Sequence, residues 1–393
     1  MAAPVPSSRL RPGPAAKACY DGESGKFLAY SEIPVNAAAR PLQLLDLDRR
    51  SLEGALAARG YQRFHAGQIF QWVYRRAVTD PAAMTDLPRE LRQTLAAEAV
   101  VALPALASRD ISVDGTEKFL FELDDRRRIE SVFIPDTPAM TFCISTQVGC
   151  AMACAFCLTG RMGLVRQLTA GEIVGQVLAL ARHVDLAGKP FNVVFMGMGE
   201  PLHNYDETMT ALRILTDAHG FAIGPRRITL STVGLPPAIE RLGREPIMPN
   251  IAVSLHAPTD ALRAELVPIA RKYGIADIIA VCKRLPLRKR SRITFEYVLL
   301  AGVNDRLQDA RRLARLLGGL KSKVNLIPLN EAPGIPFRRP SDEAIDAFAR
   351  TLADHGAVVS VRKSRGRDIR AACGQLIVEG SRKSAAQRLA VRM

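Results

Sequence analysis

The sequence contains no run of about 18 apolar residues, the length that a membrane-spanning helix needs. Its seven cysteines are too few and too unevenly spaced to form a disulfide scaffold in a chain of 393 residues. Acidic residues are also scarce, since 39 Asp and Glu stand against 54 Lys and Arg. The resulting net charge of +15 favours a polyanionic partner such as RNA, although it could equally serve solubility alone.

The amino-terminal segment MAAPVPSSRLRPGPAAK lacks the apolar stretch of a secretory signal. It is basic and free of acids like a transit peptide, but its four prolines would break the amphipathic helix that such peptides form. We therefore expect residues 1–40 to be a flexible tail. The apolar content of 48% is enough for a hydrophobic core, and three cysteines within eight residues suggest a metal centre in a reducing compartment. We expect a cytoplasmic protein that is not bound to a membrane.

Residues 41–105 have the periodicity of amphipathic helices. In LLDLDRRSLEGALAARG the apolar residues recur at spacings of three and four, and Asp46 or Asp48 precedes them as a candidate cap. HAGQIFQWVYRRAV predicts a second helix, in which Trp72 is expected to anchor the core. Pro81 and Pro88 then separate two shorter helices. We expect this region to be a helical accessory domain that binds folded RNA by its shape.

The pattern changes to short extended runs at residue 106. KFLFELDD and RRIESVFIP predict a hairpin or small sheet within residues 106–138, leading into the main domain. Residues 139–380 alternate six strand-like segments with amphipathic helices, which predicts a parallel sheet in an open doubly wound form or in a closed or partial barrel. The strand candidates are TFCIST, NVVFMGM, RRITLSTV, NIAVSLH, RITFEYVLL and KVNLIPLN. Residues 381–393 are a basic tail.

Polar and glycine-rich residues gather where successive predicted strands end. These segments are GMGEP at 197–201, STVG at 231–234, SLHAP at 254–258 and Asn330. Both open sheets and barrels of this class place active sites at the carboxyl ends of their strands. Packing alone does not explain special residues at matching ends, so we expect the functional site there.

The segment VGCAMACAFCLTG places Cys150, Cys154 and Cys157 in the loop after the first of these strands, with the spacing C-x3-C-x2-C. Three thiolates on one loop can hold three irons of a 4Fe–4S cluster and leave the fourth iron open for a small chelating ligand. A zinc site normally needs a fourth protein ligand, and neither Cys nor His occurs close by to supply it. We therefore favour an iron–sulfur centre over zinc and over a chance cluster of buried cysteines.

This cysteine motif, with Phe156 before its last cysteine, resembles the signature of the radical S-adenosylmethionine (SAM) enzymes. The segments QVGCAMACAFC, VFMGMGEPLHNY, ITLSTVG, AVSLHAP, NLIPLN and RGRDIRAACGQL also resemble, in order and approximate spacing, those of the RlmN/Cfr adenosine methyltransferases. The resemblance covers about residues 42–380. It implies an α/β fold, a partial (β/α)6 radical SAM barrel with the helical accessory domain at its amino terminus.

The resemblance also implies roles for individual residues. The cluster ligands would be Cys150, Cys154 and Cys157. The SAM contacts would be Gly199, Glu200, Ser231, Ser254, Leu255, His256 and Asn330. Cys373 would carry a methyl group as S-methylcysteine, Cys143 would be the resolving thiol in a transient disulfide with Cys373, and Glu130 would be the proton acceptor.

The chemistry explains why two thiols are needed. Carbon 2 of adenine has no lone pair, so direct displacement on SAM is not possible and a radical route is required. In the family one SAM methylates Cys373, and a second, cleaved with an electron from the cluster, supplies the radical that takes hydrogen from that methyl group. The carbon radical adds to adenine. Release of the product then needs a base, Glu130, and attack of Cys143 on the Cys373 sulfur.

The implied partners are 23S rRNA, before ribosome assembly is complete, tRNA, and a flavodoxin- or ferredoxin-type reductant. We expect a monomer. The basic stretches 283–292 and 362–370 are candidate RNA contacts, and the second lies just before Cys373, although either could be a solvated face. Cys19 and Cys282 receive no role.

Each catalytic assignment has a structural alternative. Without the family match, Cys143 would be a packed core cysteine, Glu130 a member of a surface ion pair and His256 a structural histidine. Two rival functions also stand. The Cfr branch methylates carbon 8 and confers antibiotic resistance, but the QVGC segment and the helical domain favour RlmN. A non-catalytic RNA-binding iron–sulfur protein would not need both Cys143 and Cys373.

Overall fold

The computed structural model describes residues 41–135, 139–184, 186 and 189–378, with two short strands before them, β1 (Cys19–Tyr20) and β2 (Phe27–Leu28), which pair antiparallel. The chain divides into two compact units, Met1–Leu42 and Gln43–Met393. The predicted tails, 1–40 and 381–393, lie outside the described residues apart from β1 and β2. Within the described part, no helix has the length and hydropathy to cross a membrane.

The helical region begins with α1, at the cap that the sequence predicts. The Asp48 carboxylate accepts from the Ser51 backbone N–H at 2.9 Å and so satisfies one of the free donors of the first turn. Ion pairs of Arg213 with Asp48 (2.6 Å) and of Arg49 with Asp217 (2.9 Å) join α1 to the barrel. The elements here are β3 (Leu42–Gln43), α1 (Arg49–Ala57), α2 (His65–Phe70), a π-helical turn (Gln71–Arg75), α3 (Arg89–Glu98) and β4 (Ala99–Val100).

Trp72 is not the core anchor that the sequence predicts. Its ring is only half-buried, its indole N–H donates to the Asp86 carboxylate, and the Arg76 guanidinium lies 4.0 Å from the ring centroid. Ile69 and Phe70, each 1% exposed, fill the core instead. The indole N–H needs a hydrogen-bond acceptor, which Asp86 offers at the surface, and this favours the position at the flank of the helix.

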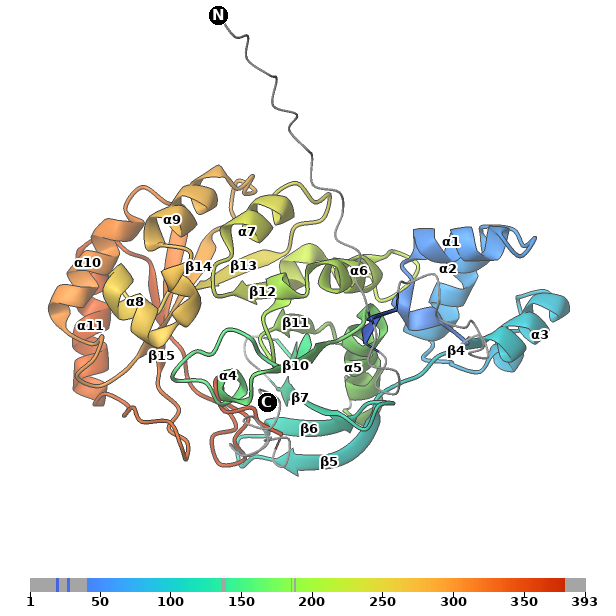
Figure 1. Ribbon diagram of the computed structural model, residues 1–393, viewed down its shortest axis with the longest axis horizontal. Helices are drawn as coiled ribbons and strands as arrows, with labels where there is room; N and C mark the ends of the chain where they lie inside the picture. Colours follow the sequence, from blue (N-terminus) through green and yellow to red (C-terminus); the bar gives the residue numbers. More distant parts are fainter. Residues whose placement is uncertain are drawn as a thin grey trace, which may run out of the picture. The chain divides into compact units, whose positions relative to one another are not determined.

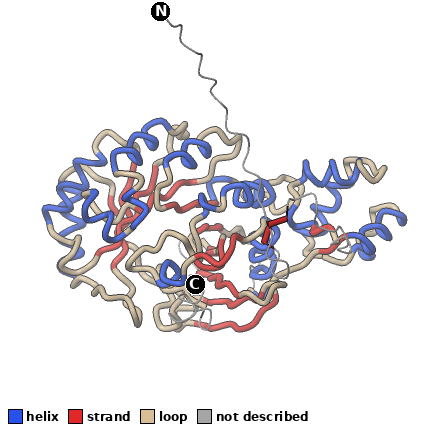
Figure 2. Tube along the Cα trace, in the orientation of Figure 1, coloured by secondary structure: helices blue, strands red, loops and turns tan. Residues whose placement is uncertain are grey.

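A ten-stranded sheet forms the centre of the molecule, in the order β16-β15-β14-β13-β12-β11-β8-β7-β6-β5. The strands from β8 to β16 in this order pair parallel, and the two outermost, β16 and β5, do not pair with each other. The sheet is therefore open, and the expected partial barrel is confirmed. Helices lie on the outer side of its curved parallel part (Figure 1), and Figure 2 shows the strands within this arc of helices.

The six predicted strand segments are all strands of this sheet. They are β8 (Thr141–Cys143), β11 (Asn192–Phe195), β12 (Ile228–Thr232), β13 (Asn250–Ser254), β14 (Ile293–Leu299) and β15 (Ser322–Pro328). A seventh parallel strand, β16 (Val359–Val361), was not predicted, because three residues carry too short a pattern. The helices between them are α5 (Ala170–His183), α6 (Tyr205–Thr216), α7 (Pro236–Leu242), α8 (Asp260–Leu266), α9 (Ile275–Arg284), α10 (Leu307–Leu317) and α11 (Asp342–Asp354).

The extended runs between residues 106 and 135 continue this sheet. The strands β5 (Ala105–Ile111), β6 (Glu117–Glu122) and β7 (Arg128–Ile134) pair antiparallel in sequence, and β7 pairs antiparallel with β8. This register sets Val132 opposite Cys143. The small β extension therefore forms one wall beside the first barrel strand.

Local sequence signals fix the start of the helix that follows the cysteine loop. Thr169 accepts from the Glu172 backbone N–H at 3.2 Å, and the Glu172 carboxylate accepts from the Thr169 N–H at 3.0 Å, which is a capping box. Before it lie a hairpin of β9 (Gln147–Gly149) with β10 (Leu164–Gln167) and the short helix α4 (Leu158–Met162). Together these elements hold the cysteine loop at the carboxyl end of β8.

Candidate active site

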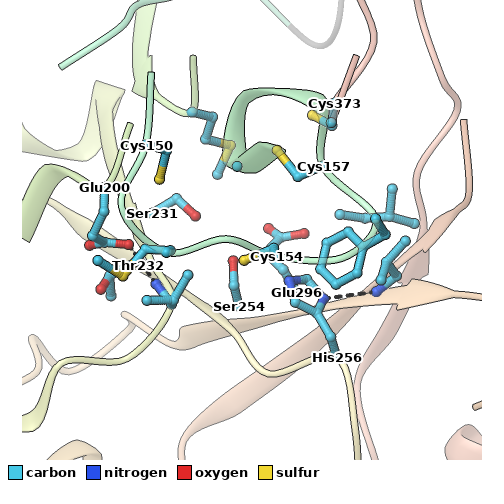
Figure 3. Close-up of a pocket in the computed structure, with 18 of the residues that line it drawn as sticks. Cys150, Cys154, Cys157, Glu200, Ser231, Thr232, Ser254, His256, Glu296 and Cys373 are labelled. Atoms are coloured by element: carbon cyan, nitrogen blue, oxygen red, sulfur yellow. Dashed lines mark hydrogen bonds between the residues drawn. The ribbon is translucent and has the colours of Figure 1, made fainter. Parts of the chain in front are cut away.

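Two adjoining cavities lie inside the barrel. The first, of about 170 Å³, contains the three clustered cysteines and is called the cluster chamber (Figure 3). The second, of about 830 Å³, contains Cys143 and is called the thiol chamber. The residues that border both are Cys157, Met196, Gly197, Glu296, Asn330, Arg362, Cys373 and Gly374. Cys373 thus stands at the junction of the two chambers.

The cysteine loop is fixed by backbone hydrogen bonds. The Cys150 N–H donates to the Gly163 carbonyl at 3.0 Å, and the Ala155 N–H donates to the Leu266 carbonyl at 2.9 Å. Gly149 has φ +77°, and a Cβ there would lie 1.9 Å from the Gly163 oxygen, so only glycine fits at this point. The sulfurs of Cys150, Cys154 and Cys157 all border the cluster chamber.

The donor set fits an iron–sulfur cluster. Burial raises the pKa of Cys150 to about 12 and also raises the pKa of Cys154 and Cys157, so the thiols must lose protons when they bind iron. Among the described residues, no group of three His, Cys, Asp or Glu side chains is placed to hold a single metal ion. A cubane does not need such convergence, because each thiolate binds its own iron.

The GMGEP segment brings a buried carboxylate to the cluster chamber. Glu200 is 2% exposed, and its carboxylate accepts from the backbone N–H groups of Leu202 at 3.1 Å and Val233 at 2.8 Å. Burial raises its pKa to about 7. Gly199 has φ +104°, and a Cβ there would lie 2.6 Å from the Gln147 side chain. The segment therefore needs this glycine to bring Glu200 to the chamber.

The ends of β12 and β13 supply hydroxyl groups and a neutral histidine. Ser231 and Ser254 border the cluster chamber. The His256 Nδ1 accepts from the Val298 backbone N–H at 3.0 Å, and burial lowers the pKa of His256 to about 3. The ring is therefore neutral, with its proton on Nε2. It packs edge to face on Phe156 of the cysteine loop, with 4.7 Å between the ring centroids.

Leu255 is the exception among the predicted SAM contacts. Its side chain is fully buried and does not border the cluster chamber, because the chain turns after β13 and directs this side chain into the core. Its carbonyl accepts from Arg263, a fully buried guanidinium that also donates to the Val233 carbonyl. Arg263 thus ties the ends of β12 and β13 together, a role that its position in an ordinary helical sequence does not reveal.

Asn330 connects the cluster chamber to the loop that bears Cys373. Its Nδ2 donates to the Cys373 carbonyl at 3.2 Å, while its buried Oδ1 accepts from no group in the described part of the chain. The Leu158 N–H donates to the Gly374 carbonyl at 2.8 Å, which joins the cysteine loop to the same segment. The free Oδ1, with the hydroxyls of Ser231 and Ser254, suits a ligand with several polar donors, as SAM is.

Cys143 and Cys373 border the same thiol chamber, although 230 positions separate them in the sequence. Cys143 ends β8 and is 7% exposed, and burial raises its pKa to about 12. The neighbouring guanidinium of Arg362 opposes this rise in the pKa. Cys282, by contrast, lies buried on α9 and borders neither chamber.

Glu130 lies outside both chambers. Its carboxylate pairs with the Lys118 ammonium at 3.2 Å and accepts from the Ile377 backbone N–H at 2.7 Å. Burial raises its pKa, and the Lys118 charge opposes the rise. Glu130 stands two residues before Val132, which borders the thiol chamber, but the carboxyl-terminal segment around Ile377 covers it.

Two residues at the junction of the chambers were missed by the sequence analysis. Glu296 on β14 is 5% exposed, and Arg362 follows β16. The sequence could have indicated Glu296, because a carboxylate within the apolar strand ITFEYVL is costly to bury without a polar partner. For Arg362 the sequence gives no indication of a role at this site beyond its position in a basic stretch.

The chain matches known families along most of its length. The model of the radical SAM superfamily matches residues 144–315, and that of the ribosomal RNA large subunit methyltransferase N-terminal domain matches residues 42–101. The dual-specificity RNA methyltransferase RlmN of Geobacter sulfurreducens is 53% identical over 325 residues, which cover 83% of this chain and 89% of the relative. The RlmN of Paracoccus denitrificans is 46% identical over 361 residues, 88% of this chain and 92% of the relative.

A solved structure supports the same relationship. The radical SAM methyltransferase from Sphaerobacter thermophilus is 50% identical and superposes with a TM-score of 0.81, covering 86% of this chain and 99% of its own. These matches confirm the fold and the use of a 4Fe–4S cluster and SAM that the motifs implied. The chain belongs to the RlmN family of radical SAM RNA methyltransferases.

Proposed function

We propose that this protein methylates carbon 2 of adenosine in 23S rRNA and in tRNA. The observation that carries the proposal is the presence of two thiols, Cys143 and Cys373, in one chamber that adjoins the chamber of the three clustered cysteines. A radical SAM enzyme that does not pass its methyl group through a thiol would have no use for this pair.

The two chambers would have different functions, cofactor binding in the cluster chamber and methyl transfer to the base in the thiol chamber. Cys150, Cys154 and Cys157 would hold the cluster, and the predicted SAM contacts that border the cluster chamber would hold SAM. The cluster and two SAM molecules per turnover supply an electron, a methyl group and a hydrogen-abstracting radical. Cys373, at the junction, is positioned to receive the methyl group from one side and to present it to a base on the other.

Cys143 would complete the reaction from the thiol chamber. Its thiolate would attack the Cys373 sulfur after the adduct has lost its unpaired electron, for which the bound cluster would be the acceptor, and its ring proton. A sulfur–sulfur bond forms, the sulfur–carbon bond breaks with its electron pair passing to the methylene carbon, and a proton taken up by that carbon completes the methyl group. The resulting disulfide must be reduced before the next turnover. Glu130 would accept the ring proton, and the segment around Ile377 would have to move to let it reach the chamber.

The partners follow from this chemistry. The helical region of residues 41–105 would hold folded RNA, and the basic stretch 362–370 would contact phosphates near Cys373. A flavodoxin- or ferredoxin-type protein would supply the electron, and the enzyme would act as a monomer in the cytoplasm on rRNA not yet assembled into ribosomes.

Mass spectrometry of the modified nucleoside tests this proposal. Cluster-loaded protein, SAM and a reductant should convert adenosine in 23S rRNA and tRNA transcripts to 2-methyladenosine. If 8-methyladenosine were the main product, the Cfr branch would be correct. RNA binding by protein that contains its cluster, without SAM cleavage and without any methylated product, would support the non-catalytic alternative.

A further inference from the structure

The thiol chamber extends well beyond the two cysteines. It is bordered by the first or second residues of several parallel strands, including Thr141, Asn192 and Thr294, so it runs along the inside of the barrel toward their amino ends. Its border also carries Lys323, Lys363 and other basic side chains. A chamber of about 830 Å³ with a basic border suits a nucleotide of the RNA substrate, whereas the cluster chamber suits the cofactor.

Glu296 is the carboxylate at the junction of these chambers (Figure 3). Side chains of two other strands hold its carboxylate in place. Its Oε2 accepts from Asn325 Nδ2 of β15 at 2.7 Å, and Asn325 Oδ1 accepts from Ser360 Oγ of β16 at 2.9 Å. The Ser360 hydroxyl thus fixes the Asn325 amide so that its N–H₂ faces Glu296.

The other oxygen of Glu296, Oε1, accepts from no group in the part of the chain that the structure describes. Arg362 and Lys323 stabilise the carboxylate electrostatically, but neither forms an ion pair with it. Because Glu296 borders both chambers, a ligand that enters them can donate an N–H or O–H to this oxygen.

The adenine ring offers one such donor. When carbon 2 faces Cys373, the exocyclic amine at position 6 is the only N–H donor of the unpaired base, and hypoxanthine carries an oxygen acceptor at that position instead. We infer that Glu296 accepts a hydrogen bond from the exocyclic amine of the target adenine and selects adenosine over inosine. This inference rests on the proposed function, because it assumes that adenine enters the thiol chamber.

The Glu296→Gln variant makes a sharp test, because Asn325 decides which way the new amide points. Asn325 Nδ2 requires an acceptor, so the glutamine oxygen should face Asn325 and its N–H₂ should face the base. The variant should then repel the adenine amine and accept the oxygen of hypoxanthine. The ratio of kcat/KM for adenosine over inosine should fall at least about tenfold, and inosine itself should become a better substrate than it is for the wild type.

The assay uses the full chain loaded with its cluster and RNA transcripts with adenosine, inosine or purine ribonucleoside at the target position. Purine ribonucleoside lacks the amine, so its loss of kcat/KM relative to adenosine should be at least about tenfold for the wild type and should nearly vanish for Glu296→Gln. Asp346→Asn, which removes an equal charge from an exposed position on α11, should keep the wild-type ratios.

Cofactor reactions separate the alternatives. Iron content and RNA-independent formation of 5′-deoxyadenosine should match the wild type in the Glu296→Gln variant, which shows that it folds and binds SAM. If SAM affinity fell instead, with the adenosine-to-inosine ratio unchanged, Glu296 would hold the cofactor and the inference would be wrong. Equal losses on all three RNAs would also overturn it. A wild-type enzyme inactive on adenosine would refute the proposed function itself.

Discussion

Replacement of Cys143 by alanine should trap the protein on its RNA substrate. The side chain is 7% exposed at the end of β8, and it loses one sulfur atom in this change. The expected cost to the free energy of unfolding is about 1 kcal/mol, so the protein should fold. Cys373 can still be methylated and joined to adenine, but no thiolate remains to attack its sulfur.

The pH dependence gives this prediction a magnitude. With a pKa of about 12, roughly one Cys143 side chain in 10,000 is a thiolate at pH 8. The groups that face it are Arg362, which lowers the pKa of Cys143, and Cys373, whose thiolate raises that pKa in the free protein but is alkylated in the adduct. Resolution of the adduct by the wild-type enzyme should therefore accelerate about tenfold per pH unit between pH 7 and 9.

A denaturing gel and rapid quenching measure these outcomes. Cys143→Ala purified from cells should migrate slowly, and nuclease should convert it to the mobility of free protein. The matched control is Cys282→Ala, which removes another buried thiol, from α9 and outside both chambers, and should remain active. The two-thiol reasoning fails if Cys143→Ala turns over and migrates as free protein. A resolution rate of the wild type that does not change with pH would contradict the raised pKa of Cys143.

Three further outcomes are expected. Cys154→Ala should lose the cluster, with iron falling from about four per chain and SAM cleavage abolished, and stoichiometric zinc in the wild type would contradict this. Glu200→Gln should weaken SAM binding at least about tenfold in equilibrium dialysis while retaining its iron, because a neutral amide replaces the buried carboxylate. Asp114→Ala should slow Cys373 methylation and speed hydrogen exchange around Gly366, because the carboxylate accepts from the Gly366 N–H at 3.0 Å and fixes the loop; unchanged exchange would show that other contacts suffice.

The sequence by itself determined the features that depend on local patterns. The Asp48 cap, the capping box at Thr169 and the six strands follow from residue spacing, because they depend on neighbours within a few positions. The cysteine motif and the strand-end segments indicated the cofactor chemistry in the same way. Strand β16 was not predicted because three residues are too few to form a pattern. The prediction that Trp72 anchors the core was wrong because the hydrogen bond of its indole N–H, not its hydrophobicity, decided where the side chain lies.

Only the tertiary structure decided which distant residues meet. The order of the strands in the sheet, rather than the spacing of residues along the chain, brings Cys143 to the chamber of Cys373. The tertiary structure also places Glu130 beneath the segment around Ile377. The sequence shows that Glu296 is a carboxylate within an apolar strand. The orientation of this carboxylate, however, depends on Asn325 and Ser360, which lie on two other strands. Hydrogen bonds between strands depend on register and burial across the whole sheet, and no local pattern of residues carries that information.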